Sequence, residues 1–421
     1  MGILLAIMTG GWVGFSLGLI PGLSVALGLG LFVVLGMHHL IGNLETACFI
    51  ASAAASAIYS RNLALVANPL VTVENVEALD PVLRMVLGGK GPQALKLQTF
   101  AVDISWIPVA FLGGVLVLAT SCGLDLAKFL DDTLTVLGIP LILCWVWTCI
   151  KASHRPRRTA LGLTLTSVFG YLVLHAPAIS GSEYQLGPIL AALFGVPIAF
   201  MAYSAPMIEP EDMDLEVEHE DTLIRQELGV LGAFIGCATG FFAGLGSTSL
   251  VAMVGSLSDS DEDYVLMSTA GSASNDIMAL LLVVAAGMGR SGEAVLLGRM
   301  VSEPHLSVTL IVGLAVAFGA YLGRSQTLRM AKRYAQLIGK IPRKGVIGVG
   351  LALTLMPVFL AGGASVVGQL TTWLLLVCGL LVAAWCRVNY LPNQVAFGSM
   401  AIPLVIQSCG LVPYVNRILY W

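Results

Sequence analysis

Long apolar stretches separated by short polar segments recur along the whole chain, and they restrict the folds open to it. Clear cases are the stretches 160–174, 185–202, 306–321 and 371–384 with their flanks. A helix that crosses a bilayer needs about 20 mostly apolar residues. Only 11% of the 421 residues are charged, against about 25% in soluble domains. The sequence therefore predicts an all-α, polytopic membrane protein.

Two glycine-rich segments, GFSLGLIPGLSVALGLG and GCATGFFAGLGSTSLVA, match each other. Gly14, Gly18, Gly22 and Leu23 of the first correspond to Gly236, Gly240, Gly244 and Leu245 of the second. Two further matches follow in the same order, between 89–97 and 289–297 and between 51–57 and 268–274. These matches predict that the chain contains an internal repeat.

The number of expected spans predicts how the two repeats are oriented. Five spans follow each glycine-rich segment, at 43–60, 96–120, 133–150, 159–176 and 184–206, and then at 263–288, 305–323, 345–361, 367–386 and 393–412. Each glycine-rich segment is itself interrupted, which predicts a re-entrant hairpin rather than a span. Because five is odd, the second repeat is expected to be inverted. The predicted organisation is a first repeat at 1–208, a charged cytoplasmic linker at 209–226, and a second, inverted repeat at 227–421.

The distribution of basic residues predicts the sidedness of the chain, because Lys and Arg concentrate in cytoplasmic loops. The segments 151–158 and 324–344 are basic and are placed in the cytoplasm. All Lys and Arg residues then lie inside, except Lys128, Arg290, Arg299 and Arg417. We expect a cytoplasmic (plasma) membrane protein with both termini outside. Its first hairpin would enter from outside and its second from the cytoplasm.

Interrupted helices in inverted repeats are typical of secondary transporters. A helix end inside the membrane presents unpaired N–H groups that bind an anion, and glycine lets the backbone approach the ligand. The alternative is that the small residues only allow close helix packing. The predicted substrate-binding residues are Pro21, Gly22, Leu23, Ser24, Ser52, Ser56, Gly244, Leu245, Gly246, Ser247, Thr248, Ser249, Ser272 and Asn275.

Two carboxylates within expected spans are candidates for ion coupling, because an acidic residue inside the membrane is costly. Asp276 lies in the middle of its span and Asp103 about two turns into its own. Either could take a proton or help to coordinate Na⁺. The alternatives are a buried, hydrogen-bonded Asp276 and an interfacial Asp103. Arg61 is expected to end its helix and to extend toward the interface, where it could also receive a departing anion.

Several chemistries have no support in the sequence. It contains no nucleotide-binding fingerprint, no HExxH motif, no nearby His base for its serine clusters, and no cysteine spacing typical of a metal site. We therefore expect no enzymatic activity, no cofactor beyond the coupling ion and no nucleic-acid partner. The expected partners are membrane lipids and either a small anion or a lipid phosphate. We expect no basic residue deep in the hairpin region, which favours a carboxylate over a phosphate.

Several motifs resemble the large permease subunit of tripartite tricarboxylate transporters, most closely its archaeal branch. They are GLIPGL, AGLGS, GGKGPQALKL, RVNYLPNQVAFGSMAIPLVI and the segment 246–281. The resemblance implies Na⁺- or H⁺-coupled import of di- or tricarboxylates. In that family a small membrane subunit and an extracytoplasmic binding protein assist the permease. A similar Pro-Gly hairpin also occurs in polyprenyl-phosphate translocases, so a flippase for such a lipid carrier is the alternative.

Overall fold

The structure is a computed structural model, and it describes most of the chain. The described residues are 2–20, 25–34, 42–67, 81–82, 84–86, 88–124, 126–153, 155–175, 187–197, 226–240, 260–287, 291–301, 306–363, 365–389, 391, 395, 398–399, 402–403, 406, 411–413 and 415. Both expected hairpin tips fall outside these residues. So do most of the linker at 209–226 and most of the last expected span at 393–412.

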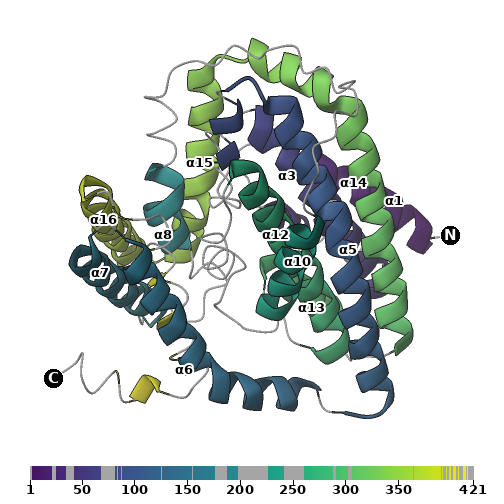
Figure 1. Cartoon of the computed structure of the whole chain (residues 1–421), viewed down its shortest axis with the longest axis horizontal. Helices are drawn as coiled ribbons and strands as arrows, with labels where there is room; N and C mark the ends of the chain where they lie inside the picture. The colour runs from purple at the N-terminus through teal and green to yellow at the C-terminus, as the bar shows by residue number, and fades with distance from the viewer. Residues whose placement is uncertain are drawn as a thin grey trace.

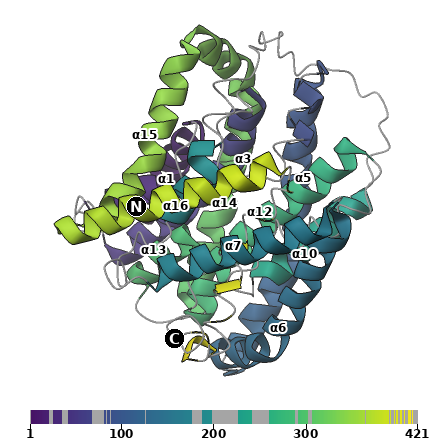
Figure 2. The ribbon, with the colours of Figure 1, turned by 90° about the vertical axis from the view of Figure 1, so that its left-hand side faces the viewer.

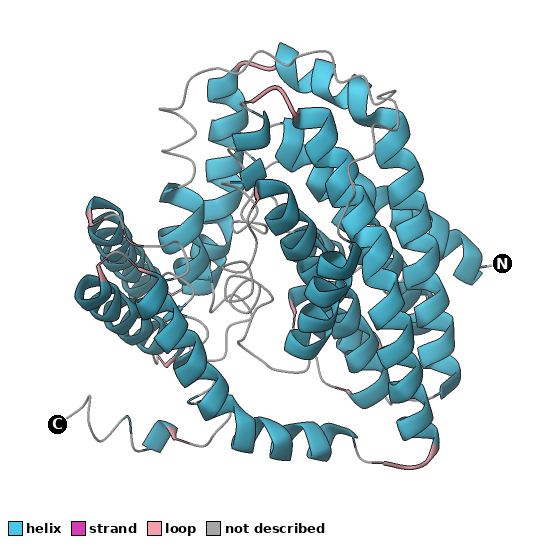
Figure 3. Ribbon diagram, viewed as in Figure 1, coloured by secondary structure: helices cyan, strands magenta, loops and turns pink. Residues whose placement is uncertain are grey.

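The described chain is helical throughout and contains no strand in these ranges (Figure 3). The first half contains α1 (Gly2–Gly18), α2 (Val25–Val34), α3 (Asn43–Ala67), α5 (Gly91–Ser121), α6 (Leu126–Ala152), α7 (Pro156–Leu174), α8 (Gly187–Leu190) and the π-helical turn η2 (Ala191–Gly195). The second half contains α10 (Gln226–Gly240), α12 (Asp261–Ala286), α13 (Gly292–Met300), α14 (Leu306–Lys340), α15 (Arg343–Gly362) and α16 (Val366–Val388).

The prediction of an all-helical fold is confirmed for the described residues, and their apolar helices are compatible with the predicted membrane location. Five of the described helices are long and apolar enough to cross a bilayer, namely α3, α5, α12, α14 and α16. Within α3, 94% of the apolar stretch is buried in the protein, against 28% in α16. The helix α3 is therefore enclosed by protein, whereas α16 presents most of its apolar surface outward.

Two helices extend beyond the spans expected from the sequence. The helix α3 continues past Arg61 to Ala67, and α14 continues for 35 residues to Lys340. The helix ends expected at Arg61 and before Arg324 were therefore wrong. Charge alone does not stop a helix, because Arg, Lys, Gln, Leu, Met and Ala are all strong helix formers.

The helices form two bundles with separate apolar cores. The central bundle contains α1, α2, α3, α5, α10, α12, α13 and α14. The peripheral bundle contains α6, α7, α8, η2, α15 and α16, and lies to the left in Figure 1. Each bundle combines elements from both halves of the chain. In Figure 2, which faces the peripheral bundle, α16 and α7 cross in front of the central helices.

Close contacts fix the direction in which neighbouring helices run. In four helix pairs the residue numbers of successive contacts rise together on both helices, so the two helices are parallel. For α1 and α3 the contacts are Gly10–Phe49 and Gly14–Ala53, and for α10 and α12 they are Gly232–Met267 and Gly236–Gly271. For α14 and α3 they are Gly319–Ser52 and Gly323–Ser56, and for α5 and α12 they are Gly113–Leu281 and Thr120–Ala285.

The helices α5 and α14 run in opposite directions. Asp103 of α5 pairs with Arg324 of α14, whereas the Leu281 side chain approaches both Gly113 of α5 and Gly313 of α14. Numbers therefore rise along α5 as they fall along α14. The helices α1 and α3 are parallel to α14, and α10 and α12 are parallel to α5. Because α5 and α14 are antiparallel, α1 and α10 also run in opposite directions.

The first glycine-rich segment is not one continuous helix. The helix α1 ends at Gly18, Leu19 and Ile20 are not helical, and α2 begins at Val25. The helices α1 and α3 run toward the same side of the bundle, and so do α10 and α12, because each pair is parallel. At about 25 Å, α1 is shorter than the roughly 30 Å hydrocarbon core.

Candidate functional site

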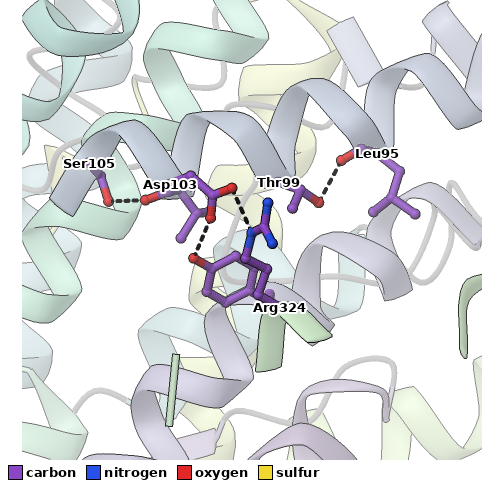
Figure 4. Close-up of polar contacts among 7 residues, drawn as sticks. Leu95, Thr99, Asp103, Ser105 and Arg324 are labelled. Carbon is purple, nitrogen blue, oxygen red and sulfur yellow. Dashed lines mark hydrogen bonds and ion pairs between the residues drawn. The ribbon is translucent and has the colours of Figure 1, made fainter. Parts of the chain in front are cut away.

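Asp103 joins three helices of the central bundle (Figure 4). Its Oδ1 accepts a hydrogen bond from the Tyr59 hydroxyl of α3 at 2.9 Å. Its Oδ2 accepts one from Arg324 Nε of α14 at 2.7 Å. The latter distance is typical of a charge-assisted hydrogen bond. Both carboxylate oxygens are therefore engaged, and an ion bound at Asp103 would have to compete with these two donors.

A second ion pair lies between α3 and α12. Arg61 and Asp276 are separated by 3.5 Å between a guanidinium nitrogen and Oδ2, and their side chains are 12% and 32% exposed. Each residue also makes at least one further interaction. The pair is longer than the Asp103–Arg324 contact and more enclosed by protein. Arg61 lies only two residues after Tyr59, so both ion pairs involve the same turn of α3.

The ends of the two interrupted helices converge on the Arg61–Asp276 pair. Gly18, the last residue of α1, packs against Ser60, the residue before Arg61. A Cβ atom placed on Gly240, the last residue of α10, would lie 3.5 Å from the Asn275 carbonyl oxygen. Asn275 directly precedes Asp276. Gly18 and Gly240, on two helices that run in opposite directions, therefore contact the residues that precede the two members of this partly buried ion pair.

The central bundle also contains buried polar atoms without hydrogen-bond partners among the described residues. Both amide atoms of Gln98 and the Asn62 amide nitrogen are of this kind, although Gln98 is fully buried and Asn62 is only 2% exposed. Such groups are costly to bury unless something satisfies them. The other three in this bundle are the hydroxyls of Ser56, Thr269 and Thr327. Polar groups of this kind are suited to a polar ligand or to water.

The remaining residues predicted to bind substrate have different environments. The Ser52 hydroxyl donates to the Ile7 carbonyl of α1 at 2.7 Å, so it joins two helices. The Asn275 side-chain oxygen accepts a bond from the Thr239 hydroxyl at 3.3 Å. Ser272 is partly buried on α12 and has an interaction partner. The ten predicted residues of the hairpin tips lie outside the described residues: Pro21, Gly22, Leu23, Ser24, Gly244, Leu245, Gly246, Ser247, Thr248 and Ser249.

Sequence reasoning missed the basic and aromatic partners of this site. The expectation of no basic residue deep in the hairpin region stays a prediction, because the hairpin tips lie outside the described residues, but Arg61 of α3 lies one residue beyond the contact of Gly18 and is 12% exposed. Arg324 and Tyr59 were not identified as partners of Asp103. One signal was available for Arg61, since the apolar residues 63–67 that follow it continue the helix. The pairing partners lie on other helices and leave no local pattern.

Further ion pairs connect helix ends on one side of the central bundle. Arg84 contacts Asp261 at 2.6 Å, and Lys90 contacts Glu262 at 3.3 Å. They hold the start of α5 beside the start of α12. These side chains are partly or well exposed, so each contact contributes at most about 1 kcal/mol. They help to fix the register of the two parallel helices.

The described residues contain no group of three or more His, Cys, Asp or Glu side chains that could hold a metal ion. The described chain is all-helical, with five helices long and apolar enough to cross a membrane. No family model, no curated protein and no solved structure matches it.

Proposed function

We propose that the protein is a secondary active transporter that moves a small organic anion, of the di- or tricarboxylate class, coupled to Na⁺ or H⁺. The observation that carries this proposal is the convergence of α1 and α10 on the Arg61–Asp276 pair. The Arg61 guanidinium, 12% exposed, would bind the anionic group of the substrate. The C-terminal ends of α1 and α10 present carbonyl oxygens, which favour the charged form of Arg61.

The two halves are proposed to be inverted repeats. Matched glycine contacts, matched serine hydrogen bonds and the directions of the helices support this. Gly14 and Gly236, which match in sequence, pack on the backbone of the equivalent helices α3 and α12. Ser52 bonds the backbone of α1, as Ser274 bonds that of α10 at 2.8 Å. The opposite directions of α1 and α10 are those expected of an inverted repeat. The match between 89–97 and 289–297 gives no such support, because it lies at the start of α5 and in the separate helix α13.

The two-bundle architecture supports an alternating-access mechanism. The proposed site lies entirely in the central bundle, whose apolar cores are separate from those of the peripheral bundle. Movement of one bundle against the other would then open the site to each side in turn without dismantling it. The re-entrant hairpins would contribute their tips to this site.

Translocation of a polyprenyl phosphate remains the second candidate, and Arg61 is the observation that favours it. A guanidinium binds phosphate at least as well as carboxylate. A lipid, however, must enter from the bilayer. The 12% exposure of Arg61 and the enclosure of α3 within protein fit a small water-soluble anion better.

The test is a thermal-shift and flux comparison with purified full-length protein. Citrate, succinate, inorganic phosphate and a short-chain polyprenyl phosphate are each added with and without Na⁺, at two pH values. A ligand present at 100 times its Kd stabilises the folded state by about 2.7 kcal/mol. We expect stabilisation by a carboxylate and its uptake into proteoliposomes. Stabilisation by polyprenyl phosphate alone would favour the second candidate, and no response to any of the four would contradict both.

A further inference from the structure

We propose that Asn62 of α3 and Gln98 of α5 form a polar subsite that binds a hydroxyl group of the substrate, so that the transported anion is a hydroxycarboxylate. This inference rests on the proposed function and specifies the substrate class further. It is carried by buried amide groups for which the described part of the chain provides no hydrogen-bond partner.

The two amides are buried and unsatisfied. Gln98 is fully buried, and neither its side-chain oxygen nor its side-chain nitrogen has a partner among the described residues. Asn62 is 2% exposed, and its side-chain nitrogen also has none. Buried amides normally form hydrogen bonds, because they lose those that they made with water. Gln93 of α5 shows the usual behaviour, since its amide nitrogen donates to Glu262 at 3.1 Å.

Asn62 and Gln98 lie at a similar depth in the central bundle. The hydrogen bond between Tyr59 and Asp103 joins α3 to α5 at 2.9 Å, and these two helices are antiparallel. Asn62 follows Tyr59 by three residues, and Gln98 precedes Asp103 by five. At 1.5 Å per residue, these steps are about 4.5 Å and about 7.5 Å in the same direction. The two residues are thus offset by only about 3 Å along the helix axes.

Both residues border the interface of α3, α5 and α12, in which each helix contacts the other two. Gln98 precedes Leu116 by 18 residues, which is five full turns. Leu116 packs with Met278 of α12, so Gln98 lies on the face of α5 that meets α12. Asn62 follows Ala55 by seven residues, or about two turns. Ala55 belongs to the apolar core that these three helices share.

Thr269 of α12 adds a third unsatisfied group at this depth. The bond from Gln93 to Glu262 sets the register of the parallel helices α5 and α12. Five residues further along both helices, Gln98 lies near Met267. Thr269 is only about 3 Å beyond that position. It is 6% exposed, and its hydroxyl has no partner among the described residues. Three helices therefore contribute unused hydrogen-bonding groups to one layer of the bundle.

The donors and acceptors of this layer specify the group that fits. A hydroxyl donates one hydrogen bond and accepts two. It can accept from the amide nitrogens of Asn62 and Gln98 while it donates to the Gln98 oxygen. An ionised carboxylate only accepts and would leave the Gln98 oxygen unpaired, whereas a cation would leave both amide nitrogens unpaired. The argument holds whichever way the Gln98 amide is turned, because both of its atoms lack partners.

The experiment compares anions that differ by a single hydroxyl group. One pair is malate and succinate, and the other is citrate and propane-1,2,3-tricarboxylate. Binding to the purified full-length protein is measured by calorimetry. The variants Gln98→Met and Asn62→Leu keep the side-chain size and remove the amide. Gln93→Met makes the same substitution on the same helix, at an amide that has a partner, and is the matched control. Gel filtration and thermal melting in detergent establish that each variant is folded.

Wild-type protein should bind the hydroxylated member of a pair at least about a hundredfold more tightly, because sites that bond a hydroxyl reject analogues without it. In Gln98→Met and Asn62→Leu this ratio should fall at least about tenfold, through weaker binding of the hydroxylated member alone. Without ligand, both variants should melt at or above the wild-type temperature, since an unpaired buried amide is replaced by an apolar group of similar size. Gln93→Met should keep the wild-type ratio.

Equal or tighter binding of the members without the hydroxyl by wild-type protein would overturn the inference and leave the proposed function intact. So would an unchanged ratio in both folded variants, which would mean that ordered water alone satisfies the amides. Failure of both variants to fold, or an equal loss of the ratio in Gln93→Met, would contradict the inference as well. A wild-type protein that binds none of the four anions would instead contradict the proposed function, on which the inference rests.

Discussion

Single polar residues in this protein hold separate helices together, and Asp103 is the clearest case. It accepts bonds from Tyr59 and Arg324, and so links α3, α5 and α14. A carboxylate with both oxygens bonded is suited to positioning helices. Asp276 contacts Arg61 at 3.5 Å and makes at least one further interaction. The two acidic residues look alike in the sequence, and their partners distinguish them.

The Tyr59 hydroxyl can be tested separately from the charges. Tyr59→Phe removes one hydrogen bond to an ionised carboxylate and leaves the ring in place. We expect the free energy of unfolding to fall by about 1.5–3 kcal/mol, measured by chemical denaturation in detergent. The control is Tyr321→Phe, since Tyr321 is 66% exposed on α14. Equal stability of the two variants would show that the Tyr59–Asp103 bond contributes nothing.

At the scale of whole helices, matched glycines set the distance between elements. A Cβ on Gly14 would overlap the Ala53 backbone, and a Cβ on Gly236 would overlap that of Gly271. We expect Gly14→Ala and Gly236→Ala each to destabilise the protein by about 1–3 kcal/mol, as overpacking does, with a fall in the melting temperature. In Gly114→Ala the added methyl has no neighbour within 4 Å, so this control should melt like wild type. If all three melt alike, α1 and α10 do not pack as described.

Hydropathy and glycine pattern were sufficient to locate most helices, because membrane-spanning length and backbone satisfaction are local requirements. They also identified Asp103 and Asp276 as unusual residues. They could not identify Arg324 or Arg61 as partners, since those contacts depend on how α3, α5, α12 and α14 pack. Helix ends at Arg61 and Arg324 were misplaced for a related reason. A basic residue indicates the end of a helix only when no acidic partner is available to it inside the bundle. Here Asp276 pairs with Arg61 and Asp103 pairs with Arg324.

For the whole molecule, contacts between helix ends agree with the predicted sidedness. The start of α5 meets the start of α12 through Arg84 and Asp261. In the peripheral bundle, the start of α7 meets the end of α16 through Arg158, which donates to the Asn389 side chain at 2.8 Å. The basic-residue distribution places all four of these ends in the cytoplasm, so the contacts join segments assigned to the same side. The far end of α5 should then lie outside.

Cys122 makes this orientation testable, because it is exposed directly after α5. In a variant whose other cysteines are replaced by serine or alanine, a membrane-impermeant maleimide should label Cys122 in intact cells. The matched probe is Arg157→Cys in the same background without Cys122, since Arg157 is exposed at the start of α7. It should be labelled only after the membrane is permeabilised, because the span predicted at 133–150, within α6, would carry the chain across between the two positions. The reverse labelling pattern would mean that the predicted orientation in the membrane is wrong, and that each proposed hairpin enters from the other side. The opposite directions of α1 and α10 would not be affected. Labelling of both positions from the same side would mean that α6 does not cross the membrane, and the inversion inferred from five spans in each half would then lose its basis.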